Sequence, residues 1–287
     1  MGRVLAVAAL LGCLAALCVN ACTGVALVRD AAVVAGGNED NDLTDPAIWA
    51  TAASDTAYGV VYFGFYFVGL GNRLPGWYEM QGVNDQGLYY DLFSMPCGSH
   101  SPVSRGAGWL GPGYPMPEAV ERTMMTTCAT VEEALAFLHA RDYSKIVPCV
   151  QVLLVDRAGN AAVYTGDGDV YRTTPGFVVT NFNLVNPSLG EYPCPRYILA
   201  SRLMGYDASP TLDRIAQILR AARIQPASPE DGGTRYSVVC DLANGIADVY
   251  LDGDFSSRIR LELAELWAQG RERVLLTELE FVPSGLP

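Results

Sequence analysis

The stretch Cys22-Thr-Gly-Val-Ala-Leu-Val-Arg-Asp-Ala-Ala-Val-Val-Ala35 contains two apolar runs that are separated by the polar pair Arg29 and Asp30. Apolar, β-branched runs on either side of a tight turn are typical of a β-hairpin. The second run leads directly into Gly36-Gly-Asn-Glu-Asp-Asn-Asp42. Because a hairpin brings its two ends together, we expect this polar segment to return to Cys22. The alternative interpretation of residues 38–42 is a solvated loop, as for most acid-rich turns.

The residues before Cys22 have the pattern of a secretory leader. A basic residue at Arg3 is followed by an uninterrupted apolar run over residues 4–19, and the small residue Ala21 precedes Cys22. These features are typical of a cleaved signal peptide. The apolar run is also shorter than the roughly 20 residues of a membrane-spanning helix. We therefore predict that residues 1–21 are removed and that the mature chain is secreted or periplasmic, with no membrane span.

The leader alone leaves three interpretations of Cys22 open. In the first, Cys22 carries a diacylglyceryl group, and the protein is a lipid-anchored, extracytoplasmic binding lipoprotein. In the second, an ordinary cysteine lies at the cut by chance. In the third, Cys22 is an N-terminal nucleophile. Its α-amine would then have a pKa of about 7.7–8.0, so that a fraction is neutral near pH 7 and can accept the thiol proton.

The composition excludes several classes of protein. Among the 287 residues, 31 are acidic and 19 are basic, which gives a net charge of −12 and disfavours a nucleic-acid partner. The only histidines are His100 and His139, too few for a histidine-rich metal site. The motifs G-x-x-x-x-G-K-[ST], H-E-x-x-H and G-x-S-x-G do not occur. We therefore expect no metal and no cofactor.

Hydrophobic periodicity beyond the hairpin predicts one α+β domain over residues 22–287, because no linker or charge block divides the chain. Asp91 lies in an apolar strand that follows a turn near residues 84–87, and it needs a polar partner if it is buried. The other expected strands are residues 58–67, 149–155, 161–164, 176–180, 236–242, 246–251 and 259–263, and the expected helices are residues 130–141, 196–204 and 210–222.

Five short segments occur in the order found in a known enzyme family. They are Cys22-Thr-Gly, Gly-Gly-Asn38-Glu-Asp40, Gly82-Val-Asn84-Asp-Gln-Gly87-Leu88, Val-Val-Thr180-Asn181, and Arg196 at the head of a helix. Over nearly all of residues 22–282 the chain resembles N-terminal nucleophile (Ntn) cysteine hydrolases of the choloylglycine hydrolase and penicillin V acylase type. Its Asn-Glu-Asp and Tyr-Asp variants are closer to the linear amide C–N hydrolases and to relatives of acyl-coenzyme A:isopenicillin N acyltransferase.

The resemblance implies a four-layer αββα sandwich with two stacked antiparallel sheets, and it implies roles for five residues. Cys22 would be the nucleophile, with its α-amine as the base. Asp40 would hold and orient that amine. Asn181 and the backbone N–H of Ser94 would stabilise the tetrahedral oxyanion, and the charge of Arg196 would favour the thiolate.

The chain departs from this family at Gly37, where bile-salt and penicillin V acylases have an arginine before the asparagine. The loop before Arg196 is also short, so that bile-salt specificity does not follow from the resemblance. The expected function is hydrolysis of a small linear amide, or transfer of its acyl group to an amine. The aromatic strand at residues 62–67 and Trp77 suit an apolar acyl group, and a homo-oligomer is compatible with the sequence.

Five cysteines lie beyond Cys22. In an oxidising compartment they allow two disulfides and one free thiol, and the alternative is a set of buried, reduced cysteines. Their spacing does not fix the connectivity. They are Cys97, Cys128, Cys149, Cys194 and Cys240.

Overall fold

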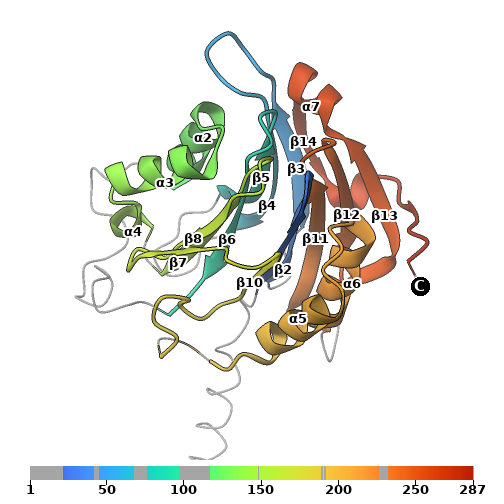
Figure 1. Cartoon of the computed structure of the whole chain (residues 1–287). Helices are drawn as coiled ribbons and strands as arrows, with labels where there is room; N and C mark the ends of the chain where they lie inside the picture. Colours follow the sequence, from blue (N-terminus) through green and yellow to red (C-terminus); the bar gives the residue numbers. More distant parts are fainter. Residues whose placement is uncertain are drawn as a thin grey trace, which may run out of the picture.

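Two antiparallel sheets stacked face to face form the centre of the molecule (Figure 1). The structure is a computed structural model that describes residues 22–41, 45–67, 76–96, 117–147, 149–188, 190, 192–225 and 232–286. The first sheet has the order β10 (Gly176–Val179), β1 (Thr23–Arg29), β2 (Ala32–Asn41), β11 (Gly233–Asp241), β12 (Ile246–Leu251), β13 (Asp254–Glu262) and β15 (Val282–Pro283). The second has the order β14 (Arg271–Leu275), β3 (Pro46–Thr51), β4 (Val60–Phe67), β5 (Gly76–Asn84), β6 (Tyr89–Ser94), β7 (Val150–Val155), β8 (Ala161–Tyr164) and β9 (Asp169–Tyr171).

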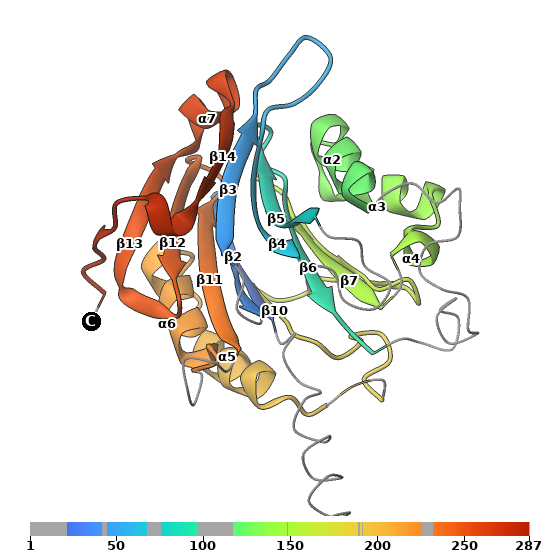
Figure 2. The same cartoon turned by 180° about the vertical axis from the view of Figure 1, so that it is seen from behind.

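Helices cover the outer face of each sheet (Figure 2). On the second sheet they are α2 (Pro117–Thr127), α3 (Val131–Ala140) and α4 (Tyr143–Ile146). On the first sheet they are α5 (Pro195–Tyr206) and α6 (Leu212–Ala222). A further helix, α7 (Leu263–Gln269), joins β13 to β14, and a short 3-10 helix follows at Leu276–Glu278. The predicted αββα layering is therefore confirmed.

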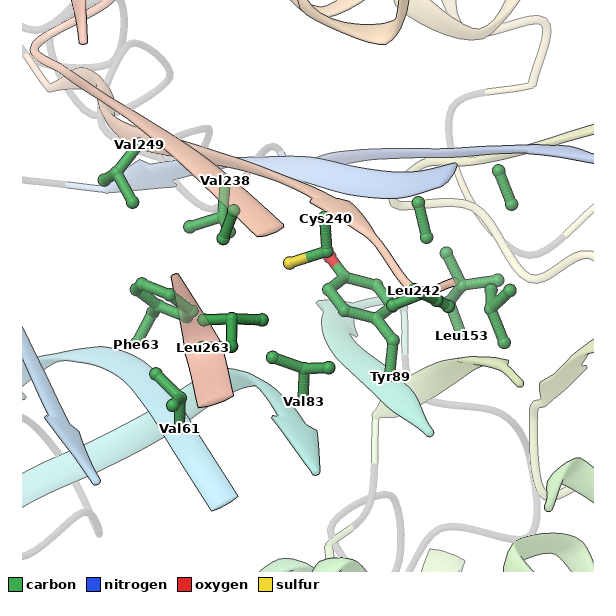
Figure 3. Close-up of a cluster of buried hydrophobic side chains, with 14 of the residues drawn as sticks. Val61, Phe63, Val83, Tyr89, Leu153, Val238, Cys240, Leu242, Val249 and Leu263 are labelled. Atoms are coloured by element: carbon green, nitrogen blue, oxygen red, sulfur yellow. The ribbon is translucent and has the colours of Figure 1, made fainter. Parts of the chain in front are cut away.

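The main hydrophobic core lies between the two sheets (Figure 3). Full burial of a large apolar side chain contributes about 1.5–3 kcal/mol, so this layer can offset the burial of polar groups at its edge. The side chains of the second sheet meet those of β11 and β12 across the interface. The central members are Val61, Phe63, Val83, Tyr89, Leu153, Val238, Cys240 and Val249.

The predicted hairpin is present, and its polar end is part of the sheet. β1 pairs with β2 in a register that sets Thr23 opposite Asn38. The side chain of Asn38 is buried, donates to the carbonyl oxygen of Leu219 at 2.9 Å and accepts from the Ser237 hydroxyl at 2.7 Å. The solvated-loop interpretation of residues 38–41 is therefore wrong, because these polar groups find partners inside the fold.

Several other elements differ from the sequence-based expectation. The strands β3, β5, β9, β14 and β15 and the helices α2, α4 and α7 were not predicted, and residue 263 begins α7 where a strand was expected. Helix α6 begins at Leu212 because the Thr211 side chain caps it by accepting from the Arg214 N–H. The predicted helix at residues 130–141 corresponds to α3, and Thr130 caps it by accepting from the Glu133 N–H at 3.2 Å.

The cysteines divide into two kinds. Cys149 is disulfide-bonded. Four others within the described ranges have free thiols, and Cys97 lies outside those ranges. The free thiols belong to Cys22, Cys128, Cys194 and Cys240, and all four are buried. None of the helices in the described part of the chain has the length and apolar character needed to cross a bilayer.

Gly64 provides a test of the packing between β4 and β5. A Cβ atom at this position would collide with the backbone carbonyl oxygen of Tyr78 at a register shift between the strands. Since backbone cannot move aside as a flexible side chain can, Gly64→Ala is expected to destabilise the fold by about 1–3 kcal/mol, measured by thermal unfolding.

The matched control is Gly205→Ala in helix α5, where a Cβ meets nothing within 4 Å. Alanine is favoured over glycine in a helix by about 1 kcal/mol, so this variant should unfold at the same temperature as wild type or higher. Equal melting temperatures for the two variants would contradict the packing argument.

Candidate active site

One guanidinium group joins the residues around the start of β1. Arg196 lies in the first turn of α5, and its Nη1 donates to the Cys22 carbonyl oxygen at 2.6 Å and to Thr23 Oγ1 at 2.9 Å. Its Nη2 donates to Asn181 Oδ1 at 3.0 Å. The same group lies 3.6 Å from Asp40 Oδ2. Arg196 therefore connects β1, the end of β2 and the segment that follows β10.

Asn181 extends this network to the second sheet. Its side-chain Nδ2 donates to the carbonyl oxygen of Ser94, the last residue of β6, at 2.8 Å. With Arg196 on its oxygen and Ser94 on its nitrogen, the amide is fixed in orientation. The structure thus places the five predicted site residues in one connected network, while their catalytic roles stay predictions.

Asp40 is buried at the end of β2. The Thr234 hydroxyl donates to its Oδ1, and its Oδ2 accepts no hydrogen bond from the described residues. Burial raises the pKa of Asp40 to about 7, although the Thr234 hydrogen bond and the charge of Arg196 act in the opposite direction. Asp40 Oδ2 is consequently an unused acceptor beside the strand that begins after Cys22.

Cys22 is buried, with 4% of its surface exposed, and its thiol donates to Glu39 Oε2 at 3.3 Å. Burial raises the pKa of the Cys22 thiol, and the charges of Glu39 and Asp40 raise it further. A hydrogen bond from the Asp40 backbone acts in the opposite direction. Arg196 contacts the carbonyl oxygen of Cys22. Because burial and the neighbouring carboxyl groups outweigh the one opposing hydrogen bond, the surroundings of the sulfur favour the neutral thiol over the thiolate.

The sequence analysis did not identify the cluster of buried polar side chains next to the Cys22 thiol. Glu39 and Asp91 are 1% and 0% exposed, and Gln81 Nε2 donates to Glu39 Oε1 and to Asp91 Oδ2, each at 3.2 Å. The Tyr89 hydroxyl also donates to Asp91 Oδ2, at 3.2 Å. The polar partners that Asp91 was expected to need are therefore Gln81, Tyr89 and Glu39. An isolated acid in an apolar strand was the sequence feature that indicated such a cluster.

Both carboxyl groups resist ionisation in this setting. Burial raises the pKa of Glu39, and the neighbouring charge of Asp91 and a hydrogen bond between the two side chains raise it further. Burial also raises the pKa of Asp91, to about 7, against the hydrogen bonds from Glu39, Tyr89 and Gln81. Glu39 and Asp91 therefore form a carboxyl pair that spans the two sheets next to the Cys22 thiol.

Gly37 creates the space for this pair. A Cβ atom there would collide with Asp91 Oδ2 and lie 2.8 Å from Gln81 Nε2. Residues two apart in a strand face the same side, so Gly37 and Glu39 both face the second sheet. Only a residue without a side chain at position 37 leaves room for the carboxyl group of Asp91.

Most of the aromatic residues proposed as a pocket pack in the core, whereas Tyr66 is exposed. Phe63 and Phe65 lie between the sheets, whereas Tyr62 lies in the core under the helices. Trp77 packs against that outer core, with its ring centroid 6.2 Å from that of Trp49. Within the described ranges, no group of three or more His, Cys, Asp or Glu side chains is arranged to hold a metal ion.

No protein-family model and no curated protein sequence matches this chain. Solved structures match its fold: an arginine-to-leucine variant of conjugated bile acid hydrolase from Clostridium perfringens has a TM-score of 0.58 at 14% identity, over 88% of this chain and 96% of that one. A cysteine-to-alanine mutant of the same hydrolase gives 0.56 at 14% identity over the same shares. Penicillin V acylase from Agrobacterium tumefaciens gives 0.54 at 15% identity, over 90% and 87%. The likeness places this chain among proteins with the stacked-sheet sandwich fold of Ntn hydrolases.

Proposed function

We propose that this protein is a secreted amidase or acylase that cleaves a linear, non-peptide amide C–N bond through a thioester on Cys22. The observation that carries the proposal is the Arg196 guanidinium, which ties the Cys22 backbone, Asp40 and Asn181 into one constellation. The solved neighbours, named as a bile acid hydrolase and a penicillin V acylase, support a hydrolase or acylase on this fold.

Removal of residues 1–21 creates the N-terminal group that this chemistry needs. With Ala21 attached, the nitrogen of Cys22 is an amide and cannot act as a base near neutral pH. Once freed, it is an amine with an ordinary pKa of about 7.7–8.0. Asp40 Oδ2, buried and without a hydrogen bond among the described residues, is the acceptor suited to hold this amine by a charge-assisted hydrogen bond.

The reaction then proceeds in two steps. The sulfur of Cys22 attacks the amide carbonyl, and the oxyanion is stabilised by the Asn181 side chain and the backbone N–H of Ser94. The leaving nitrogen takes a proton as the C–N bond breaks, which leaves a thioester. Water hydrolyses the thioester in an amidase, and an amine accepts the acyl group in an acyltransferase. The resemblance gives the proton transfers to the α-amine of Cys22.

The inward direction of the thiol argues against the lipoprotein alternative. A lipid anchor requires a sulfur that faces the bilayer. The Cys22 thiol donates instead to Glu39 Oε2, a buried atom of the neighbouring strand. A diacylglyceryl group on this sulfur would have to displace that contact.

The nature of the first residue is tested by intact-mass analysis and substitution. The secreted protein is expected to begin at Cys22 without a lipid adduct. Cys22→Ser should yield a soluble, folded protein that is nearly inactive, because the hydroxyl is a weaker nucleophile at neutral pH. Activity is measured on N-acyl amino acids, acyl-homoserine lactones, penicillin V and small amide-linked amines, with and without an acyl acceptor. A diacylglyceryl adduct on Cys22 would overturn the proposal.

Asn181 is tested by Asn181→Ala on the best substrate of that panel. Loss of one oxyanion donor lowers the turnover number by about 10²–10³-fold, and thermal unfolding should show a folded protein. The matched control is Asn244→Ala, which removes an exposed asparagine from the turn between β11 and β12. Full turnover in Asn181→Ala would remove this residue from the proposed site.

A further inference from the structure

We propose that Glu39, supported by Asp91, is the group that accepts the proton of the Cys22 thiol when the nucleophile is activated. This inference rests on the proposed function and adds to it a carboxyl base that the family resemblance does not include. The α-amine of Cys22 is thereby left to protonate the leaving nitrogen.

The geometry provides the transfer path. The thiol of Cys22 already donates to Glu39 Oε2 at 3.3 Å, within the range for a sulfur donor. The other carboxyl oxygen of Glu39 is held by Gln81 at 3.2 Å, which fixes the direction of the group. This contact involves only the thiol and the carboxyl, so it is independent of the α-amine and of leader removal.

The second carboxyl makes Glu39 a better base. Two buried carboxylates side by side cannot both ionise readily, so the pair retains one proton, which Glu39 holds toward Asp91. Glu39 can therefore take the thiol proton as it passes its own proton to the ionised Asp91. Among the described residues neither carboxyl forms an ion pair, and the Arg196 guanidinium is paired with Asp40. The titratable and polar groups that surround the pair are Cys22 directly before β1, Asp40 of β2, Gln81 of β5, Tyr89 of β6, and Tyr236 and Cys240 of β11.

The proton balance closes over one reaction cycle. In acylation the S–H bond breaks, its electron pair stays on sulfur, and the proton forms an O–H bond on Glu39 as the proton that Glu39 held moves to Asp91. The Cys22 ammonium, held at Asp40, gives a proton to the leaving nitrogen. In deacylation the neutral amine takes a proton from water as the hydroxide adds to the thioester. The departing sulfur then recovers its proton from Glu39, and the proton on Asp91 returns to Glu39.

The first test is the pH dependence of kcat/KM for wild type, Glu39→Gln and Asp91→Asn. Glutamine keeps the shape of Glu39 and one of its two acceptor oxygens but cannot take a proton, so Glu39→Gln should lower kcat/KM by about 10²–10⁴-fold. Asp91→Asn should shift the acidic limb of the profile to lower pH, because the charge that raises the pKa of Glu39 is gone and Glu39 ionises by itself.

The control is Glu121→Gln, which alters a buried glutamate that binds Tyr143 beneath the helices. Its kcat/KM and its pH limb should match wild type. Wild-type kcat/KM in Glu39→Gln, or an unshifted limb in Asp91→Asn, would overturn the proposal even if the protein is an amidase.

The second test needs no substrate and uses alkylation of Cys22 by iodoacetamide, followed by mass spectrometry of its peptide. In wild type the alkylation rate should rise in a step near pH 7, where the pKa of Asp91 lies. Once the pair has lost a proton at this pH, it can accept the proton of the thiol. The double variant Glu39→Gln/Asp91→Asn should lose this step, and Glu121→Gln should keep it. Identical profiles in wild type and the double variant would overturn the proposal.

The two tests separate this inference from the proposed function. If no amide of the panel is hydrolysed but the alkylation step depends on the pair, the amidase proposal fails and the proton acceptor stands. If amides are hydrolysed but neither profile responds to Glu39, the acceptor fails and the amidase stands.

Discussion

The pairing of β1 with β2 is the constraint on which the rest of the site depends. Its register sets Gly24 opposite Gly37 and Thr23 opposite Asn38, so that Cys22 lies at the open end of the hairpin beside Glu39. A shift by one residue would turn every side chain of β2 to the other face of the sheet. Glu39 would then leave the thiol, and Asp40 would leave Arg196. One hairpin register therefore positions Cys22, the proposed nucleophile, and the two acids Glu39 and Asp40 beside it.

The buried acids make the site unfavourable for stability at neutral pH. A group whose folded-state pKa is raised stabilises the fold below its ordinary pKa, and this contribution is lost as the pH rises through the folded value. For Asp40 and Asp91 the window runs from their ordinary pKa of 3.8 to about 7, and Glu39 acts in the same direction. Buried carboxyl groups with strongly perturbed pKa values are typical of functional sites, so their cost in stability is consistent with a functional role.

Local patterns in the sequence were sufficient for some of the fold. The first hairpin, the cap of α3 at Thr130 and the β7–β8 hairpin each depend on residues close together in the chain. The strand β14, with the sequence Arg-Glu-Arg-Val-Leu, lacks such a pattern, and it forms because it pairs with β3. Helix α7 is likewise held by a distant contact, in which Trp267 Nε1 donates to the Val83 carbonyl oxygen at 3.1 Å.

The same limit applies to the site. Cys22, Asp40, Ser94, Asn181 and Arg196 could be named because family motifs mark them, and the fold brings them together. The pairing of the acids from β2 and β6 could not be predicted, since it arises only where the two sheets stack. No periodicity within either strand encodes a contact between them.

Gly37 stands where the family resemblance leads one to expect an arginine, and this difference bears on the proposed chemistry. An arginine at this position would place a cation beside the thiol and would occupy the space that Asp91 fills, since even a Cβ atom collides with its carboxylate. Arginine and the carboxyl pair are therefore alternatives for the same volume. A cation stabilises a thiolate by charge, whereas a carboxyl pair favours the thiol and offers it an acceptor. Under the proposed mechanism, the glycine at position 37 allows proton transfer to the carboxyl pair to take the place of electrostatic activation, so that a neutral resting thiol can still be activated.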